Sequence, residues 1–481
     1  MTHLAGVRMS GSLSYRNYRN NNGGGRLRWP LIVFVILVFF TLLITGSALY
    51  KENSQAHANM PTATPTVTPI PSPTPTDTEP SPSPKPGKNP TEEPKQIASG
   101  PYGLWEPTPS PTPTMYIPPG TVIWMADWED TRTPVDVKGA YVSSKSAASR
   151  SKVNEVMDII DRTELNAVII DIKDDYGKIV YNFDSELLRK YGAITNSVSY
   201  LKDLVAELHE RGIYAIARIV SFKDSVVAKA RPDLSYNMTN GARYVDGSGE
   251  LWLSLFKQEV WEYLAEIGIQ CAKIGFDEIN YDYMRAPTDK TVVRDSAGVI
   301  VREIDFGEEH KTKTVIEAVT EGVKYLCETL RKENVYISAD VYGTIIGSPV
   351  DTRSTGQDYI QLAQYLDYIC PMIYPSHYAD GWRGFKYPDK EPYGVIRQAL
   401  IESTRELDTI PPYFHRAQVR PWLQAFTADY KGKDQNGVEK YIPYDAAAIR
   451  NEIQAVYDTE HVSWLLWNAN SNYSEKYLMP E

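Results

Sequence analysis

Cysteine and metal-binding motifs are scarce in this chain of 481 residues. Its three cysteines, Cys271, Cys327 and Cys370, lie far apart and show no CxxC spacing. They are typical of small buried apolar residues, and they imply no disulfide framework. The seven histidines show no HxH or HExxH spacing, and none of them ends a predicted strand. This pattern argues against a metal-dependent amidohydrolase, and we expect no metal site.

Excess positive charge is also missing. The chain has 50 Lys+Arg against 61 Asp+Glu, which gives a formal net charge of −11. Proteins that bind nucleic acid usually present a basic face, so we expect no nucleic-acid partner. The sequence contains no GxSxG elbow, and no glycine-rich phosphate loop closes the last predicted strands. We therefore expect no cofactor.

A long uncharged segment lies near the N-terminus. Residues 1–28 form a polar tail with five arginines and no acidic residue, and residues 29–50 contain the run LIVFVILVFFTLLITGSAL. That run is long enough to cross a hydrocarbon layer of roughly 30 Å. Because the arginines before it should stay in the cytoplasm, we predict a single-pass membrane anchor with the rest of the chain outside.

The alternative to an anchor is a cleaved signal peptide and a secreted protein. Ala56-His57-Ala58 resembles a cleavage site, but the apolar run is longer than the usual signal core of about 7–15 residues. Residues 51–120 are rich in Pro, Thr and Ser, and such a segment cannot bury a core. We interpret them as a disordered linker that holds the following domain away from the membrane.

Residues 121–481 have a globular composition in which strand-like and helix-like segments alternate. Eight strands alternating with helices favour a (β/α)8 TIM barrel. An open α/β sheet is the alternative, but it would normally have fewer strands and a glycine-rich first turn. The role of residues 121–138 stays open, since WMADWED is either an extra strand or a strap. The predicted strands are Gly139–Ser143, Ala167–Lys173, Tyr214–Val220, Gly275–Tyr283, Val335–Tyr342, Tyr368–Tyr374, Arg420–Ala425 and Val462–Asn468.

The predicted loops are unequal in length. Segments that lead into strands are mostly short, whereas several that leave strands are long, such as Ser221 to about Gln258 and Pro375–Tyr393. In a barrel, the segments leaving strands gather at the C-terminal face, where active sites lie. Within one of them, Thr291–Glu303 has the pattern of a small hairpin that turns at Ser296–Gly298.

Polar residues follow one face of the predicted fourth strand. Glu278, Asn280 and Asp282 alternate with apolar or outward residues, and a barrel strand packs its outer face on helices. Three polar residues in register therefore face the lumen or a site. Asp282 comes last and should lie at the rim, where Arg285 is placed to fix it or balance its charge.

Other predicted strands also end in polar or aromatic side chains. Carboxylates on neighbouring strand ends suit glycosidic cleavage, in which one carboxyl protonates the leaving oxygen and the other attacks or activates water. The alternative is that these acids form rim salt bridges with the basic residues among them. A Schiff base at Lys173 is disfavoured, because its acid-rich surroundings favour an ion-paired ammonium. The further candidates are Asp171, Lys173, Arg218, Asp340, Tyr374, Trp422, Gln424 and Trp467.

Several segments resemble a bacterial family of glycoside-hydrolase-like barrels first catalogued as a domain of unknown function. They are GAYVSS, NAVIIDIKDDYG, ARIVSFKD, GFDEINYDYMRAP, ISADVYG, DYICPMIYPSHY and VRPWLQAF, between Gly139 and Asn468. The resemblance implies a barrel distantly similar to the α-amylase and α-galactosidase group, whose fourth strand ends in a catalytic Asp nucleophile. Asp282 is the matching position. The general acid of α-amylases is a Glu after the fifth strand, whereas this chain offers Asp340 within it.

These observations lead to one hypothesis and two rivals. We expect an O-glycosyl hydrolase that acts on an extracellular or cell-wall polysaccharide, with Asp282 as nucleophile or base and Asp340 as general acid. The other candidate residues would bind substrate or position these two carboxyls. The first rival is a non-catalytic glycan-binding barrel for cell-wall attachment. The second is another barrel hydrolase, such as a metal-dependent deacetylase.

Overall fold

The computed structural model describes residues 132–480. The predicted tail (1–28), anchor (29–50) and linker (51–120) lie outside these residues, and so does the WMADWED segment. Within residues 132–480, no helix combines the length and the apolar character needed to cross a bilayer.

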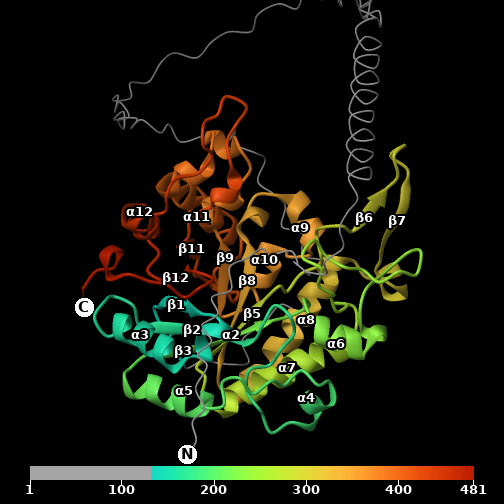
Figure 1. Ribbon diagram of the computed structural model, residues 1–481, viewed down its shortest axis with the longest axis horizontal. Coiled ribbons are helices and arrows are strands. Elements are labelled where there is room, and N and C mark those ends of the chain that lie inside the picture. The colour runs from blue at the N-terminus through green and yellow to red at the C-terminus, as the bar shows by residue number, and fades with distance from the viewer. Residues whose placement is uncertain (1–131, 481) are drawn as a thin grey trace, which may run out of the picture. The chain divides into compact units, whose positions relative to one another are not determined.

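The described part of the chain folds into a closed barrel of eight parallel strands (Figure 1). Around the barrel the order is β9-β11-β12-β1-β2-β3-β5-β8, and β8 pairs with β9 to close it. Each strand coincides with one predicted from the sequence, so the TIM-barrel prediction is confirmed. The strands are β1 (Lys138–Val142), β2 (Ala167–Lys173), β3 (Tyr214–Val220), β5 (Glu278–Asp282), β8 (Tyr336–Tyr342), β9 (Tyr368–Met372), β11 (Trp422–Gln424) and β12 (Trp464–Trp467).

The seventh barrel strand is interrupted. A short segment, β10 (Gln418–Val419), pairs with β9, and β11 follows after Arg420 and Pro421. Proline cannot donate a backbone hydrogen bond, so it is poorly suited to the middle of a paired strand. The break places Arg420 inside the barrel, where it pairs with Glu278 of β5.

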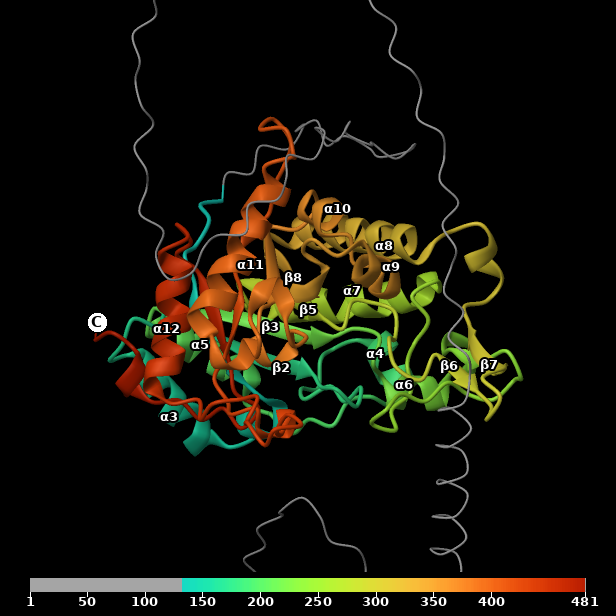
Figure 2. The same cartoon turned by 90° about the horizontal axis from the view of Figure 1, so that it is seen from above.

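Helices surround the strands, as Figures 1 and 2 show. In α8, Thr314 and Glu317 form a capping box that satisfies backbone donors at the first turn. Its apolar residues at spacings of three and four face the barrel. The helices are α2 (Ser144–Ala147), α3 (Arg150–Ile160), α4 (Glu186–Lys190), α5 (Leu201–Glu210), α6 (Ser225–Ala230), α7 (Gln258–Lys273), α8 (Val315–Leu330), α9 (Pro349–Thr355), α10 (Tyr359–Ala363), α11 (Pro392–Leu407) and α12 (Ala446–Tyr457).

The two faces of the strands build two different cores. Outward residues such as Ile279, Tyr281 and Ile337 pack against the helices in one large apolar layer. Inward residues such as Ile169, Ile216 and Leu465 fill the lumen. The polar face of β5 therefore points into the lumen, as the alternation of its residues predicts.

Long segments leave the C-terminal ends of the strands. The segment after β5 carries a hairpin of β6 (Val292–Arg294) and β7 (Ile300–Asp305), and β7 also pairs with β4 (Asn237–Met238) from the segment after β3. This confirms the predicted hairpin. Figures 1 and 2 both show it projecting beyond the barrel strands.

The opposite end of the barrel is covered by the residues just before β1. Arg132 donates to the carbonyl of Val335 and pairs with Asp367, and the Val135 amide donates to the Tyr368 hydroxyl. These partners lie where β8 and β9 begin, so residues 132–137 run across the N-terminal end. The sequence left the role of residues 121–138 undecided between an extra strand and a strap. Of these residues, 132–137 form a strap.

All three cysteines are buried and free. Burial raises the pKa of the Cys271 and Cys370 thiols well above the usual range and that of Cys327 to about 12. This agrees with the prediction that they act as small apolar residues.

Candidate active site

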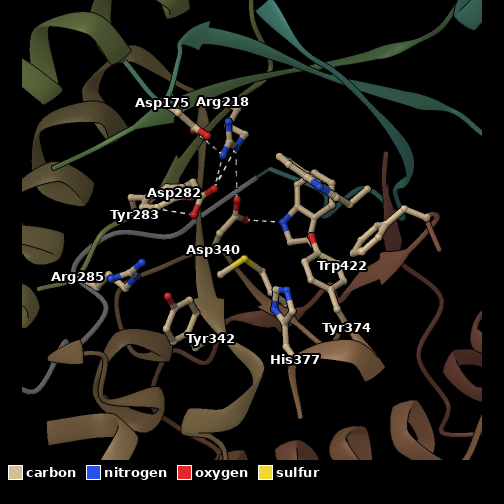
Figure 3. Close-up of a pocket in the computed structure, with 13 residues that line it drawn as sticks. Asp175, Arg218, Asp282, Tyr283, Arg285, Asp340, Tyr342, Tyr374, His377 and Trp422 are labelled. Carbon is tan, nitrogen blue, oxygen red and sulfur yellow. Dashed lines mark hydrogen bonds and ion pairs between the residues drawn. The ribbon is translucent and has the colours of Figure 1, made fainter. Parts of the chain in front are cut away.

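A pocket of about 230 Å³ opens at the C-terminal ends of the barrel strands (Figure 3). Five of its side chains are formally charged, and most of the others are aromatic. Such a mixture of carboxylates and ring faces is suited to a sugar. The lining residues are Asp175, Arg218, Asp282, Tyr283, Arg285, Asp340, Tyr342, Met372, Tyr374, His377, Trp422, Phe426 and Trp467.

Arg218, on β3, is the electrostatic centre of this pocket. It is buried, its Nη1 donates to Asp171 at 2.5 Å, and its Nε donates to Asp282 at 3.2 Å. Asp175 lies 3.7 Å from Nη2. One guanidinium thus serves several carboxylates, and its planar fork makes such multiple contacts possible.

Asp282 ends β5 at the rim, as predicted. Its Oδ1 accepts the backbone N–H of Tyr283 at 2.6 Å, and its Oδ2 is held by Arg218. Tyr283 has a φ of 51°, which is unfavourable for an aromatic residue. Such a conformation persists only where the surroundings enforce it, and it turns the chain sharply behind the carboxylate.

Asp340 lies on the adjacent strand, β8, and is almost fully buried. Burial raises the pKa of its carboxyl well above the usual range, and the negative charge of Asp282 raises it further. Oδ1 accepts two hydrogen bonds, from Asn280 Nδ2 at 2.9 Å and from Trp422 Nε1 at 2.6 Å. Because both acceptor positions of Oδ1 are used, the proton of the neutral acid belongs on Oδ2.

The two carboxyls lie close enough to work together. Arg218 Nε is 3.2 Å from Asp282 Oδ2 and 3.9 Å from Asp340 Oδ2. Both distances start from one atom, so the two oxygens cannot be farther apart than the two distances added together. That maximum lies within the range of about 5–9.5 Å that separates the two carboxyls of glycosidases. Figure 3 shows the two side chains converging on Arg218.

Asp171, on β2, stands behind this pair. It accepts the Tyr141 hydroxyl at 2.5 Å and the Arg218 guanidinium. Burial raises the pKa of Asp171 to about 6, although the charge of Arg218 opposes that rise. Asp171 does not line the pocket, so it positions Arg218 and does not face the substrate.

Glu278 and Asn280 lie deeper in the lumen than Asp282. Arg420 Nη1 donates to both oxygens of Glu278 at 2.8 Å, and Ser338 and Tyr214 donate to the same carboxylate. Glu278 is therefore satisfied within the protein and does not reach the pocket. Asn280 also stays below the pocket, where it orients Asp340.

Strict alternation along the predicted second strand places Lys173 on the same face as Asp171, and this prediction was wrong. The register of β2 against β3 shifts between Asp171 and Lys173, which pairs opposite the outward residue Ile219. Such a bulge reverses the side on which the following residue points. Lys173 is buried away from the pocket, 3.0 Å from Asp224 and hydrogen-bonded to the Val220 carbonyl.

Gln424 is inward but also lies outside the pocket lining. Its Oε1 accepts the Ser376 hydroxyl at 2.7 Å, and its Nε2 donates to Asp389 at 2.9 Å. Gln424 therefore ties together two parts of the long segment after β9 and does not face the pocket.

Arg285 does not fix Asp282, contrary to the sequence expectation, because Arg218 holds that carboxylate. Arg285 lines another wall of the pocket. Its guanidinium carbon lies 4.6 Å from the centre of the Tyr342 ring, 4.9 Å from that of Trp252 and 5.2 Å from that of Tyr283.

The three aromatic residues among the candidates, Tyr374, Trp422 and Trp467, all line the pocket. Trp467 stacks on Tyr141 with centroids 4.0 Å apart, and Tyr374 packs edge-on to His377 and Phe426. Trp422 is buried and directs its indole N–H at Asp340. Trp422 therefore also binds the Asp340 carboxyl, a contact that the sequence did not indicate.

Sequence reasoning missed several residues of this region. Tyr141 and Arg420 contact charged partners from distant parts of the chain, and only the fold brings them there. His377 follows β9 in a long loop, and burial lowers its pKa to about 4, so its ring is neutral near neutral pH. Asp175 is the second residue after the predicted second strand, and this position is the signal that could have identified it.

Within residues 132–480, no group of three His, Cys, Asp or Glu side chains is arranged to hold a metal ion. Residues 139–473 match the family described as "Putative glycosyl hydrolase domain". The chain belongs to this family. The match confirms the family resemblance and the enzyme class that the sequence predicts.

Solved structures with detectable likeness cover different shares of the chain. A hypothetical protein from Ruminiclostridium thermocellum is 30% identical over 42% of this chain and 97% of its own, with a TM-score of 0.37. The PgaB (BpsB) glycoside hydrolase domain from Bordetella bronchiseptica is 15% identical over 70% and 95%, with a TM-score of 0.45. An α-galactosidase from Thermus thermophilus is 13% identical over 72% and 61%, with a TM-score of 0.41. No curated protein matches this chain.

Proposed function

We propose that this glycosyl hydrolase cleaves O-glycosidic bonds with two carboxyls, Asp340 as general acid and Asp282 as nucleophile or base. One observation carries the proposal. A carboxyl with a strongly raised pKa lies beside a carboxylate that is ion-paired with Arg218. In glycosidases, different environments allow one of two neighbouring carboxyls to act as the acid and the other as the base or nucleophile.

The reaction assigns the proton to a definite atom. Asp340 Oδ2 carries it and transfers it to the glycosidic oxygen as the bond to the anomeric carbon breaks. Asp282 then either forms the bond to that carbon or removes a proton from the water that forms it. Asn280 and Trp422 stabilise the resulting Asp340 carboxylate, because both donate to its Oδ1.

The remaining pocket residues position these groups and the sugar. Arg218 orients Asp282, and the ring faces of Tyr374 and Trp467 provide stacking surfaces. We also propose that the substrate is an extracellular or cell-wall polysaccharide and that the barrel is held outside the cell by an anchor at residues 29–50. The uncharged run and the arginines before it support this location, and a secreted form would result if the segment is cleaved.

The test is release of reducing ends by a soluble fragment that starts near Met115, on a panel of α- and β-glycans and purified cell wall. Asp282→Asn and Asp340→Asn should each lower turnover by about 10²–10⁴-fold, because each removes a group that acts in the transition state. Both variants replace a carboxyl by an amide of the same size, so the fold should be kept.

Asp295→Asn is the matched control. Asp295 lies in the exposed turn between β6 and β7, and an amide can accept the same turn hydrogen bonds. It should cleave like the wild type. Unchanged turnover in Asp282→Asn, on a substrate that the wild type cleaves, would overturn the proposed mechanism.

A further inference from the structure

Arg285 occupies a wall of the pocket that the proposed mechanism does not use. It lies in the segment after β5, only 6% exposed, and it lines the same cavity as Asp282 and Asp340. In Figure 3 it stands beside Tyr342, away from Trp422 and His377. The acid pair and Arg285 thus face one cavity from different sides.

This arginine differs from the other buried arginines of the lumen. Arg218 and Arg420 are each paired with carboxylates, whereas no carboxylate within residues 132–480 lies within ion-pair distance of Arg285. Within the described part of the chain, its hydrogen bond goes from Nη1 to the carbonyl of Ala286 at 2.9 Å. A buried cation without a counter-charge is costly, and its contacts with three aromatic rings offset only part of that cost.

The charges of the pocket favour a ligand with one negative charge at this wall. Arg218 is occupied by its carboxylates, and His377 is neutral near neutral pH. A planar guanidinium matches a planar carboxylate with two parallel hydrogen bonds. A phosphate with nearly two charges would meet a single free cation here, and Asp175 and Asp282 would oppose its second charge.

We infer that the substrate is an acidic glycan and that Arg285 binds the carboxylate of a uronic acid residue next to the cleavage site. The position of that residue next to the cleaved bond rests on the proposed function. The recognition itself depends only on the pocket. The three rings around Arg285 hold the guanidinium in place, so little side-chain entropy is lost on binding.

Binding is measured by calorimetry with the inactive Asp282→Asn protein, so that probes are not consumed. The probes are oligogalacturonides and hyaluronan oligosaccharides, their carboxyl methyl esters, and sulfated galactan oligosaccharides. Arg285→Gln and Arg285→Lys are added in that background. Arg302→Gln is the matched control, because Arg302 lies on β7 in the same segment but outside the pocket.

Arg285→Gln should weaken binding of a carboxylate probe by about 10- to 100-fold, the effect of losing a hydrogen bond to a charged group. Arg285→Lys should retain part of the affinity for the carboxylate probe, and Arg302→Gln should retain all of it. The methyl ester should bind poorly to every variant. Added salt should weaken binding of the carboxylate probe more when Arg285 is present than in the Arg285→Gln variant.

Other results would overturn the inference. Equal affinity for acid and ester, stronger binding of the sulfated probe, or no binding of any acidic probe would each do so. An equal loss for acid and ester in Arg285→Gln would assign Arg285 to supporting the rings. Wild-type cleavage of neutral glycans alone would reject the inference and keep the hydrolase. Carboxylate-specific binding without cleavage of any glycan would keep the inference about Arg285 and reject the proposed hydrolase.

Discussion

The two ends of the barrel lumen use the same residue types in opposite ways. In the lower part, Glu278 and Arg420 form a balanced pair that other side chains complete. At the upper end, on the same face of β5, Asp282 belongs to a group of acids around Arg218. The charges of the lower pair balance, and the Glu278 carboxylate is fully hydrogen-bonded, although Arg420 Nε and Nη2 have no hydrogen-bond partner within the described residues. At the upper end one cation cannot balance all of its neighbours, and burial together with the charge of Asp282 raises the pKa of Asp340 well above the usual range.

The two acids of β5 therefore have different expected roles. Glu278 should contribute to stability, and Asp282 should contribute to the proposed reaction. The buried Glu278–Arg420 pair is held by hydrogen bonds within the protein and does not face the pocket. A surplus of carboxyls creates a proton donor beside a negative charge, and perturbed groups of this kind gather at functional sites. The following changes test the two ends independently.

The largest effect is expected at the lower end. Arg420→Met leaves Glu278 buried without its counter-charge, and the free energy of unfolding should fall by about 3–5 kcal/mol. Urea denaturation measures the change. Adding Glu278→Met should restore most of the stability, because it removes the unpaired charge. Arg416→Met, which breaks the exposed pair with Asp408, should cost about 1 kcal/mol or less. A loss that small in Arg420→Met would disprove the assigned role.

The next effect concerns pH and the upper end. In the proposed mechanism Asp340 must carry its proton to act, and its pKa is raised by burial and by Asp282. The kcat should therefore stay high well above the ordinary range of an aspartic acid and fall about tenfold per pH unit once the pH exceeds the raised pKa. A kcat that already falls between about pH 4 and 5 would show that Asp340 is not the acid. Arg420→Lys, at the lower end, should leave the profile in place.

The smallest effect is expected for Trp422→Phe. The indole N–H donates to Asp340 Oδ1 and lowers its pKa, so removing it should raise that pKa. The alkaline limb of the kcat profile should then move upward by about one pH unit or less. Trp464→Phe removes an indole whose N–H bonds to Tyr457 elsewhere, and it should not move the limb. A downward shift for Trp422→Phe would contradict the geometry.

The strands and the inward face of β5 were predictable from the sequence because alternation is a local property of the chain. The partner of Glu278 was not, since Arg420 lies 142 positions away and enters the lumen only where the seventh strand is interrupted. Lys173 was misplaced because a bulge leaves no mark in the alternation of residues. Nearness in sequence suggested Arg285 as the partner of Asp282, whereas the neighbouring strand supplies Arg218.

The sealed cysteines have a practical consequence. A thiol reacts as its thiolate, and the buried thiols of Cys271, Cys327 and Cys370 hold their protons at neutral pH. A single cysteine introduced at an exposed position, such as Val301 on the projecting hairpin, would therefore be the preferred target for a maleimide dye within residues 132–480. The native cysteines would therefore contribute little background to a fluorescent label on this hairpin.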